Sequence, residues 1–169
     1  SADFHNHATA YLMAELFEQH DRNKFELIAF SFGPESKDEM RQRISSCFDQ
    51  FIDVRDQTDR DIALHSRNMG IDIAVDLKGY TGDSRCGIFS YRAAPIQISN
   101  LGYPGTMGAD YIDYLLADKT LIPRDSQQHY SEKIIYLPHS YQVNDTQRRI
   151  STKVFSRQEL GLPQTGFVF

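Results

Sequence analysis

The sequence predicts an α/β fold in which a mostly parallel sheet carries helices on both faces. Short apolar segments alternate with segments of helical periodicity along most of the chain, an order typical of successive β-α-β units. The apolar segments are continuous rather than alternating with polar residues, as expected for strands that are buried on both faces. With 169 residues, the chain is also long enough to form one domain with its own core.

The expected elements follow one another in a regular order. Residues 7–20 place Leu12, Met13, Leu16 and Phe17 on one helical face, and the first helix is expected to be capped by Asn6 or Thr9. Further helices are expected at 37–48, 58–70 and 84–94, and strands at 25–32, 50–54, 71–79, 95–100 and 132–138. The segment 111–118 fits either a strand or a short helix.

Both ends of the chain carry a prediction about organisation. The polar cluster at residues 3–7 runs directly into the first helix, which indicates either a disordered tag or, as the other segments favour, a preceding strand. Residues 1–141 are expected to form one lobe and the polar stretch 142–158 a linker. Residues 159–169, which end in Phe-Val-Phe, are expected to begin a strand of a second lobe.

Composition excludes several classes of function. Lys and Arg total 18 against 23 for Asp and Glu, a net charge of −5, so a nucleic-acid-binding role is not expected. No apolar run approaches the roughly 18 residues that span a membrane. Cys47 and Cys86 are isolated and form neither a disulfide framework nor a zinc knuckle. A reducing cytoplasm is the simplest location.

Three loops are candidates for a binding site, because ligands of open parallel sheets bind beyond the carboxyl ends of the strands. They are residues 3–9, if a strand precedes them, 78–85 and 101–108. The third loop, LGYPGTMG, matches neither the dinucleotide fingerprint nor a P-loop. Its glycines indicate either a plain turn or a close approach of a ligand to the backbone.

The polar side chains in these loops each fit more than one role. His7, at a helix start, suits a general base, a hydrogen-bond donor or part of a capping cluster, and the helix N-terminus favours an anionic group such as phosphate. No third ligand lies near His5 and His7, so no metal site is expected. Lys78 and Arg85 could contact phosphate or an acceptor chain, with solvated surface charge as the default. His65, inside a helix, is expected to be structural.

Five segments, in order, resemble one known family. DFHNHATAYLM, FELIAFSF, GIDIAVDLKGYT, APIQISNLGYPGTMG and YSEKIIYLPHSY look like the amino-terminal lobe of the catalytic region of protein O-GlcNAc transferases, glycosyltransferase family 41, which includes SPINDLY-type proteins. The resemblance implies a GT-B architecture, in which a nucleotide-sugar cleft separates two Rossmann-like lobes, and a strand before the DF…NH motif. It also implies inverting, metal-independent transfer of N-acetylglucosamine from UDP-GlcNAc to protein Ser or Thr hydroxyls, without a cofactor.

The same resemblance assigns roles to individual residues. Asp3 and His7 match the catalytic loop. Substrate-binding positions are matched by Asn6 in that loop, Thr9 near the acceptor and sugar, Arg85 near the acceptor path, and Leu101, Gly102 and Pro104 in the sugar-contacting loop. Ala8 departs from the family, where a proline usually follows the histidine.

The resemblance also limits what the chain does alone. In the family, the second lobe holds the UDP diphosphate, so this chain is expected to be the acceptor-side lobe and inactive by itself. Its expected partners are a nucleotide sugar, protein acceptors, a tetratricopeptide region and the second lobe. Two alternatives remain open: a SPINDLY-type lobe that transfers fucose from a GDP donor, and a protein-binding module without catalysis.

Overall fold

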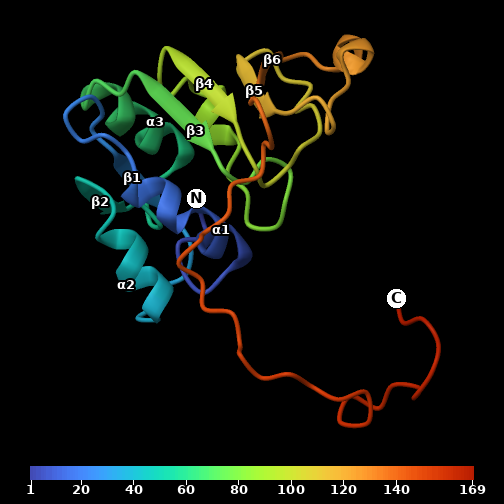
Figure 1. Ribbon diagram of the computed structural model, residues 1–169. Helices are drawn as coiled ribbons and strands as arrows, with labels where there is room; N and C mark the ends of the chain where they lie inside the picture. Colours follow the sequence, from blue (N-terminus) through green and yellow to red (C-terminus); the bar gives the residue numbers. More distant parts are fainter.

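Two parallel β-sheets lie side by side in the computed structural model, which describes residues 1–169. The first pairs β1 (Ile28–Ser31) with β2 (Gln50–Asp53). The second has four strands in chain order, all parallel: β3 (Ile73–Asp76), β4 (Ile96–Ser99), β5 (Tyr114–Ala117) and β6 (Lys133–Tyr136). Figure 1 shows both sheets with helices packed against them. The α/β class with parallel strands is therefore confirmed, and residues 111–118 contain a strand.

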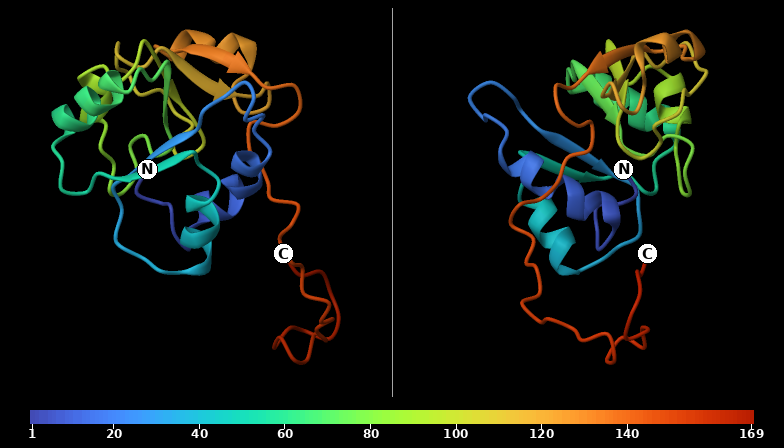
Figure 2. Two further views of the ribbon diagram at one scale, coloured as in Figure 1. Left: turned by 90° about the vertical axis from the view of Figure 1, so that its left-hand side faces the viewer. Right: turned by 45° about the vertical axis from the view of Figure 1, so that its right-hand side comes forward.

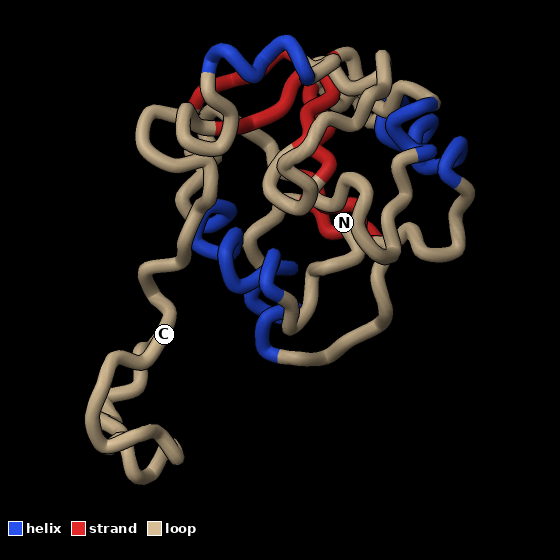
Figure 3. The backbone as a smooth tube through the Cα atoms, turned by 90° about the vertical axis from the view of Figure 1, so that its right-hand side faces the viewer, coloured by secondary structure: helices blue, strands red, loops and turns tan.

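The helices form two main groups. α1 (Ala8–Glu18) packs against α2 (Glu39–Ser45), and α3 (Asp59–Asn68) packs against the short α4 (Gly87–Ser90). Figure 3 shows these groups apart, with strands between them. A 3₁₀ helix, η1 (Arg124–His129), follows β5 and was not expected from the sequence.

β1 is buried on both faces by these helices. Ala29 belongs to a core cluster with Met13 of α1 and Ile44 of α2. The next residue, Phe30, packs against a second cluster that contains Ile62 of α3 and Phe89 beside it in α4. Successive side chains of a strand point to opposite faces, so this alternation explains why the strand is a continuous apolar run.

The helix boundaries follow local capping chemistry. Thr58 caps α3, as expected, by accepting a hydrogen bond from the Asp61 N–H at 3.2 Å. The cap of α1 is His7 rather than Asn6 or Thr9, because its Nδ1 accepts from the Thr9 N–H. That correction matters for the site, since the capping atom belongs to a predicted catalytic residue.

The sheet is divided where one continuous sheet was expected. On its side away from β2, β1 is met only by Ser1, whose amine donates to the Phe30 carbonyl at 2.9 Å and whose carbonyl accepts from the Phe32 N–H at 3.1 Å. β3 pairs with β4 alone. An apolar groove of about 340 Å³ lies between these strands, and Ile73 and Val75 on β3 are about half exposed beside it. The free edges of β1 and β3 line this groove.

After β6 the chain returns to the first helices. Residues 141–147, which we term the strap, pass beside α1 (Figure 1) and contact side chains of both α1 and α2. Asp145 pairs with Arg43, and the Thr146 N–H donates to Glu15 at 2.6 Å. Residues 137–169 contain no helix or strand, and both views of Figure 2 show the last of them, drawn in red, standing away from the rest. Residues 159–169 form no strand, and the second lobe expected to begin there stays a prediction.

No helix has the length and apolar character needed to cross a membrane.

Candidate functional site

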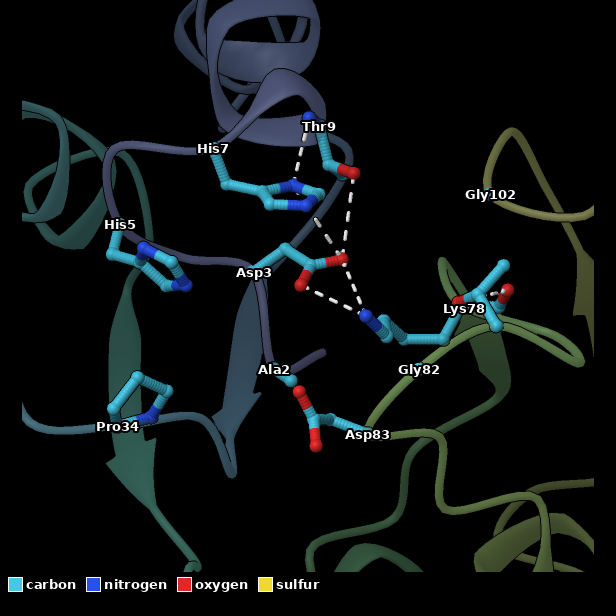
Figure 4. A pocket seen from close by; sticks show the side chains of 11 residues that line it. Ala2, Asp3, His5, His7, Thr9, Pro34, Lys78, Gly82, Asp83 and Gly102 are labelled. Atoms are coloured by element: carbon cyan, nitrogen blue, oxygen red, sulfur yellow. Dashed lines mark hydrogen bonds and ion pairs between the residues drawn. The ribbon is translucent and has the colours of Figure 1, made fainter.

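A cavity of about 490 Å³ opens beyond the carboxyl ends of β1, β3 and β4. Figure 4 shows its lining, which comes from four loops: Ala2, Asp3, His5, His7, Thr9, Pro34, Lys78, Thr81, Gly82, Asp83 and Gly102. Parallel sheets bind ligands at this edge. The structure therefore brings together residues of all three loops that the sequence singled out.

A buried ion pair forms the floor of the cavity. The Lys78 ammonium lies 2.9 and 3.0 Å from the two carboxylate oxygens of Asp3. Each residue is only 5% exposed. The default expectation of a solvated surface charge is thus wrong for Lys78. Burying an ammonium is costly unless it is paired, and Asp3 supplies the pair.

The capping bond of α1 defines the hydrogen-bonding state of His7. Its Nδ1 accepts the Thr9 N–H at 3.2 Å, and an accepting nitrogen carries no proton. In the neutral ring the proton therefore lies on Nε2. The imidazole, whose side chain is 42% exposed, offers a hydrogen-bond donor at Nε2.

Asp3 contacts the start of α1 as well as Lys78. Its Oδ2 accepts a long hydrogen bond of 3.5 Å from the Thr9 hydroxyl and lies 3.7 Å from Nδ1 of His7. Figure 4 shows Asp3 between the helix start and Lys78. The carboxylate thus joins both sides of the cavity floor.

The turn after β3 is held by its own hydrogen bonds. The Asp76 carboxylate accepts from the N–H groups of Lys78 at 2.8 Å and Gly79 at 3.1 Å. Gly79 has a φ of 57°, a conformation that glycine adopts without strain. The Tyr80 hydroxyl donates to the Met107 carbonyl at 2.8 Å. This bond ties the second loop to the third.

Four predicted substrate-binding residues lie outside the cavity lining. Arg85 is occupied elsewhere, because it pairs with Asp59 and donates to the Gln57 carbonyl at 2.7 Å. Asn6 and Pro104 are exposed without reaching the cavity, and Leu101 packs against the core cluster of α1 and α2. Of the predicted site residues, the structure assembles Asp3, His7, Thr9 and Gly102.

Sequence reasoning missed several lining residues. Pro34 follows β1, so the rule that selected the other loops would have found it had it been applied to that strand. Asp83 lies in a selected loop, has a φ of 57° and makes no hydrogen bond or ion pair. His5 also lines the cavity, and its ring lies 5.8 Å from that of His7.

The Cys86 thiol, just before α4, is held in an unreactive state. Burial raises the pKa of the Cys86 thiol, and its Sγ lies 3.5 Å from the Gly79 carbonyl. A protonated thiol is a poor nucleophile. No group of three or more His, Cys, Asp or Glu side chains is placed to hold a metal ion.

This geometry suits a polar substrate with hydroxyl or phosphate oxygens. His7 presents a donor, and the N-terminus of α1 presents the positive end of a helix dipole. The cavity is partly open to solvent rather than enclosed.

Comparisons with known proteins agree on one family. The family model of Glycosyl transferase family 41 matches residues 1–160. A protein of Arabidopsis thaliana named as a probable UDP-N-acetylglucosamine–peptide N-acetylglucosaminyltransferase SEC is 38% identical over 174 aligned residues, which cover 100% of this chain and 18% of that protein. A UDP-N-acetylglucosamine–peptide N-acetylglucosaminyltransferase of Caenorhabditis elegans is 32% identical, covering 86% of this chain and 13% of its own length. A solved structure of a mutant O-GlcNAc transferase of Thermobaculum terrenum superposes with a TM-score of 0.81 at 33% identity, covering 84% of this chain and 27% of that one.

Proposed function

Because the chain belongs to glycosyl transferase family 41, we propose that it is the acceptor-side lobe of a protein O-GlcNAc transferase. The chain spans less than a fifth of the two relatives described above, so the activity of a whole protein is part of this proposal. The observation that carries it is the cavity, which gathers Asp3, His7 and Thr9 at the sheet edge where a nucleotide sugar would bind.

The proposed reaction is the transfer of N-acetylglucosamine from UDP-GlcNAc to a protein Ser or Thr. The hydroxyl oxygen forms a bond to the anomeric carbon, the bond from that carbon to the β-phosphate oxygen breaks, and UDP leaves as the hydroxyl loses its proton. This chemistry needs no metal or cofactor in the proposal.

The geometry supports an orienting role for His7. A ring that accepts at Nδ1 donates at Nε2, so it can hold the acceptor hydroxyl or a sugar oxygen but cannot take a proton there. Both oxygens of Asp3 are engaged by Lys78. We therefore propose that a phosphate oxygen of the leaving nucleotide takes the proton, while His7 and Thr9 align the two substrates.

A second lobe would supply the remaining groups. One open face cannot enclose a diphosphate, and stabilising the charge of the leaving group is usually a large part of catalysis. We propose that the second lobe holds the diphosphate, that a tetratricopeptide region binds acceptor proteins, and that the enzyme works in the cytoplasm. Four predicted substrate-binding residues lie outside the cavity, and we expect them to contact the substrates only if the loops move or the second lobe brings the substrates to them. They are Asn6, Arg85, Leu101 and Pro104.

The proposal is tested with the two-lobed enzyme, in which this chain is joined to a diphosphate-binding lobe. Labelled UDP-GlcNAc and labelled GDP-fucose are offered separately with a Ser-containing and a Thr-containing peptide. Transfer from UDP-GlcNAc alone supports the proposal. Transfer from GDP-fucose alone assigns the fucosyl alternative, and transfer from neither leaves the protein-binding module.

A further inference from the structure

Lys78 reaches Asp3 from a part of the fold that is 75 residues away in sequence. Asp3 follows Ser1, which is hydrogen-bonded to β1 of the first sheet, and Lys78 follows β3 of the second. The ion pair therefore spans the two sheets at their carboxyl edges. The ion pair lies at the floor of the cavity, and its Asp3 carboxylate is close to both His7 and Thr9.

The ammonium is projected from a backbone that cannot easily move. The Lys78 N–H donates to Asp76, and its carbonyl accepts from the Thr81 hydroxyl at 3.0 Å. Gly102 lies against the same turn, where an added Cβ would come within 2.9 Å of the Lys78 carbonyl oxygen. Because its backbone is held at these points and its side chain is buried, the Lys78 ammonium has a fixed place.

What it binds is the carboxylate that contacts the start of α1. Asp3 Oδ2 receives Lys78 at 3.0 Å and the Thr9 hydroxyl at 3.5 Å, and it lies 3.7 Å from His7 Nδ1. Without the ammonium, this buried carboxylate would lose its closest ion-pair partner and would move toward solvent. That movement would disturb the two residues that it contacts.

We propose that Lys78 is a positioning residue, whose ammonium holds the Asp3 carboxylate in place so that Thr9 keeps the His7 ring in its donating orientation. The effect of Lys78 on sugar transfer rests on the proposed function. Its effect on the orientation of the His7 ring is independent of that function. The competing explanation is that the ion pair only joins the two sheets. In that case, any well-packed neutral pair of side chains would leave the orientation of His7 unchanged.

The orientation of His7 is tested on the 169-residue chain by ¹⁵N NMR, which distinguishes the two neutral tautomers of the ring. The variants are Lys78→Arg, Lys78→Met and the double variant Asp3→Asn with Lys78→Met. The double variant leaves no unpaired buried ion, so it can be measured even if Lys78→Met does not fold. We expect the wild type and Lys78→Arg to carry the proton on Nε2, and the folded Met variants to show a mixture of tautomers with at least tenfold faster exchange of the Thr9 amide. A folded double variant with the wild-type tautomer and exchange rate would overturn the proposal.

Kinetics of the two-lobed enzyme test the consequence for transfer. Misplacing reacting groups by about 1 Å costs on the order of 100-fold in rate, so Lys78→Met should lower kcat by about 10- to 100-fold with KM within about twofold, and Lys78→Arg should recover most of the loss. Lys24→Met is the matched control, because Lys24 pairs with Asp21 on the surface, and it should leave both constants unchanged. A kcat for Lys78→Met within twofold of the wild type contradicts the proposal. If the wild type transfers no sugar, the proposed function fails, while the NMR measurement still tests the position of His7.

Discussion

Gly102 lies against the backbone of Leu77, so close that a Cβ on Gly102 would come within 2.2 Å of the Leu77 carbonyl oxygen. The neighbour is backbone, which cannot rotate aside like a side chain. The glycine of the third loop therefore sets how near the second loop can come to it. Close approach between loops, rather than between backbone and ligand, accounts for this glycine.

Gly102→Ala should push the turn that carries Lys78 away from the third loop. We expect a loss of about 1–3 kcal/mol in the free energy of unfolding, as for overpacked sites, measured by urea denaturation. Gly82→Ala is the control, because Gly82 lines the same cavity with open space around its Cβ position and no positive φ. Equal stability of the two variants would show that the contact does not constrain the loops.

The strap should detach in acid. Hydrogen bonds from Arg43 hold the pKa values of Glu18 and Asp145 below their usual range. A carboxylate with a depressed folded pKa stabilises the fold above its unfolded pKa, about 4 for these groups, and loses that contribution as the pH falls through the folded value. The protection factor of the Thr146 amide, its exchange rate relative to the intrinsic rate at each pH, should fall below about pH 4.

Arg43→Met provides the control for the strap. It removes the cation that both carboxylates share, so the strap should be loose at neutral pH with little further change in acid. An amide of Thr146 that stays equally protected from pH 7 to 3 in the wild type would rule out this account of the strap.

His7 has a structural role that can be separated from its chemistry. Asparagine is among the best N-caps and alanine is a poor one. His7→Ala should therefore cost about 1 kcal/mol of stability, whereas His7→Asn should cost less than about 0.5 kcal/mol. Thermal unfolding of the 169-residue chain measures both, and a similar loss in the two variants would mean that the capping bond adds nothing.

The chain alone should bind UDP-GlcNAc only weakly. The cavity has one open face, which leaves most of the diphosphate in water, so calorimetry should give a Kd weaker than about 1 mM. Micromolar binding would place the diphosphate site on this lobe and remove the need for a second one.

Much of the fold follows from local patterns that the sequence displays directly. The continuous apolar run at Ala29 and Phe30 predicts a strand buried on both faces, and Thr58 predicts the start of α3. The grouping of the strands into two sheets was not predictable, because it depends on which strands pair with one another, and β1 does not pair with β3. Such pairing is a property of distant segments.

The site was predictable in its loops but not in its contacts. Strand ends identified the loops of Asp3, His7 and Gly102. Nothing local distinguishes Lys78, which is buried in an ion pair, from Arg85, which turns to Asp59. Both are basic residues of one loop, and only the three-dimensional position of their carboxylate partners separates them.

The most direct measurement of the central claim, that this cavity is the active site, compares two histidine variants in the two-lobed enzyme. His65 lies in α3 and packs edge-on against Phe30 at 5.5 Å between ring centres, outside the cavity lining. His7→Asn keeps the helix cap but removes the imidazole donor, so it should lower kcat with UDP-GlcNAc and a peptide acceptor by about 100-fold or more. His65→Asn should change stability more than rate. Transfer abolished by His65→Asn and left intact by His7→Asn would contradict the account.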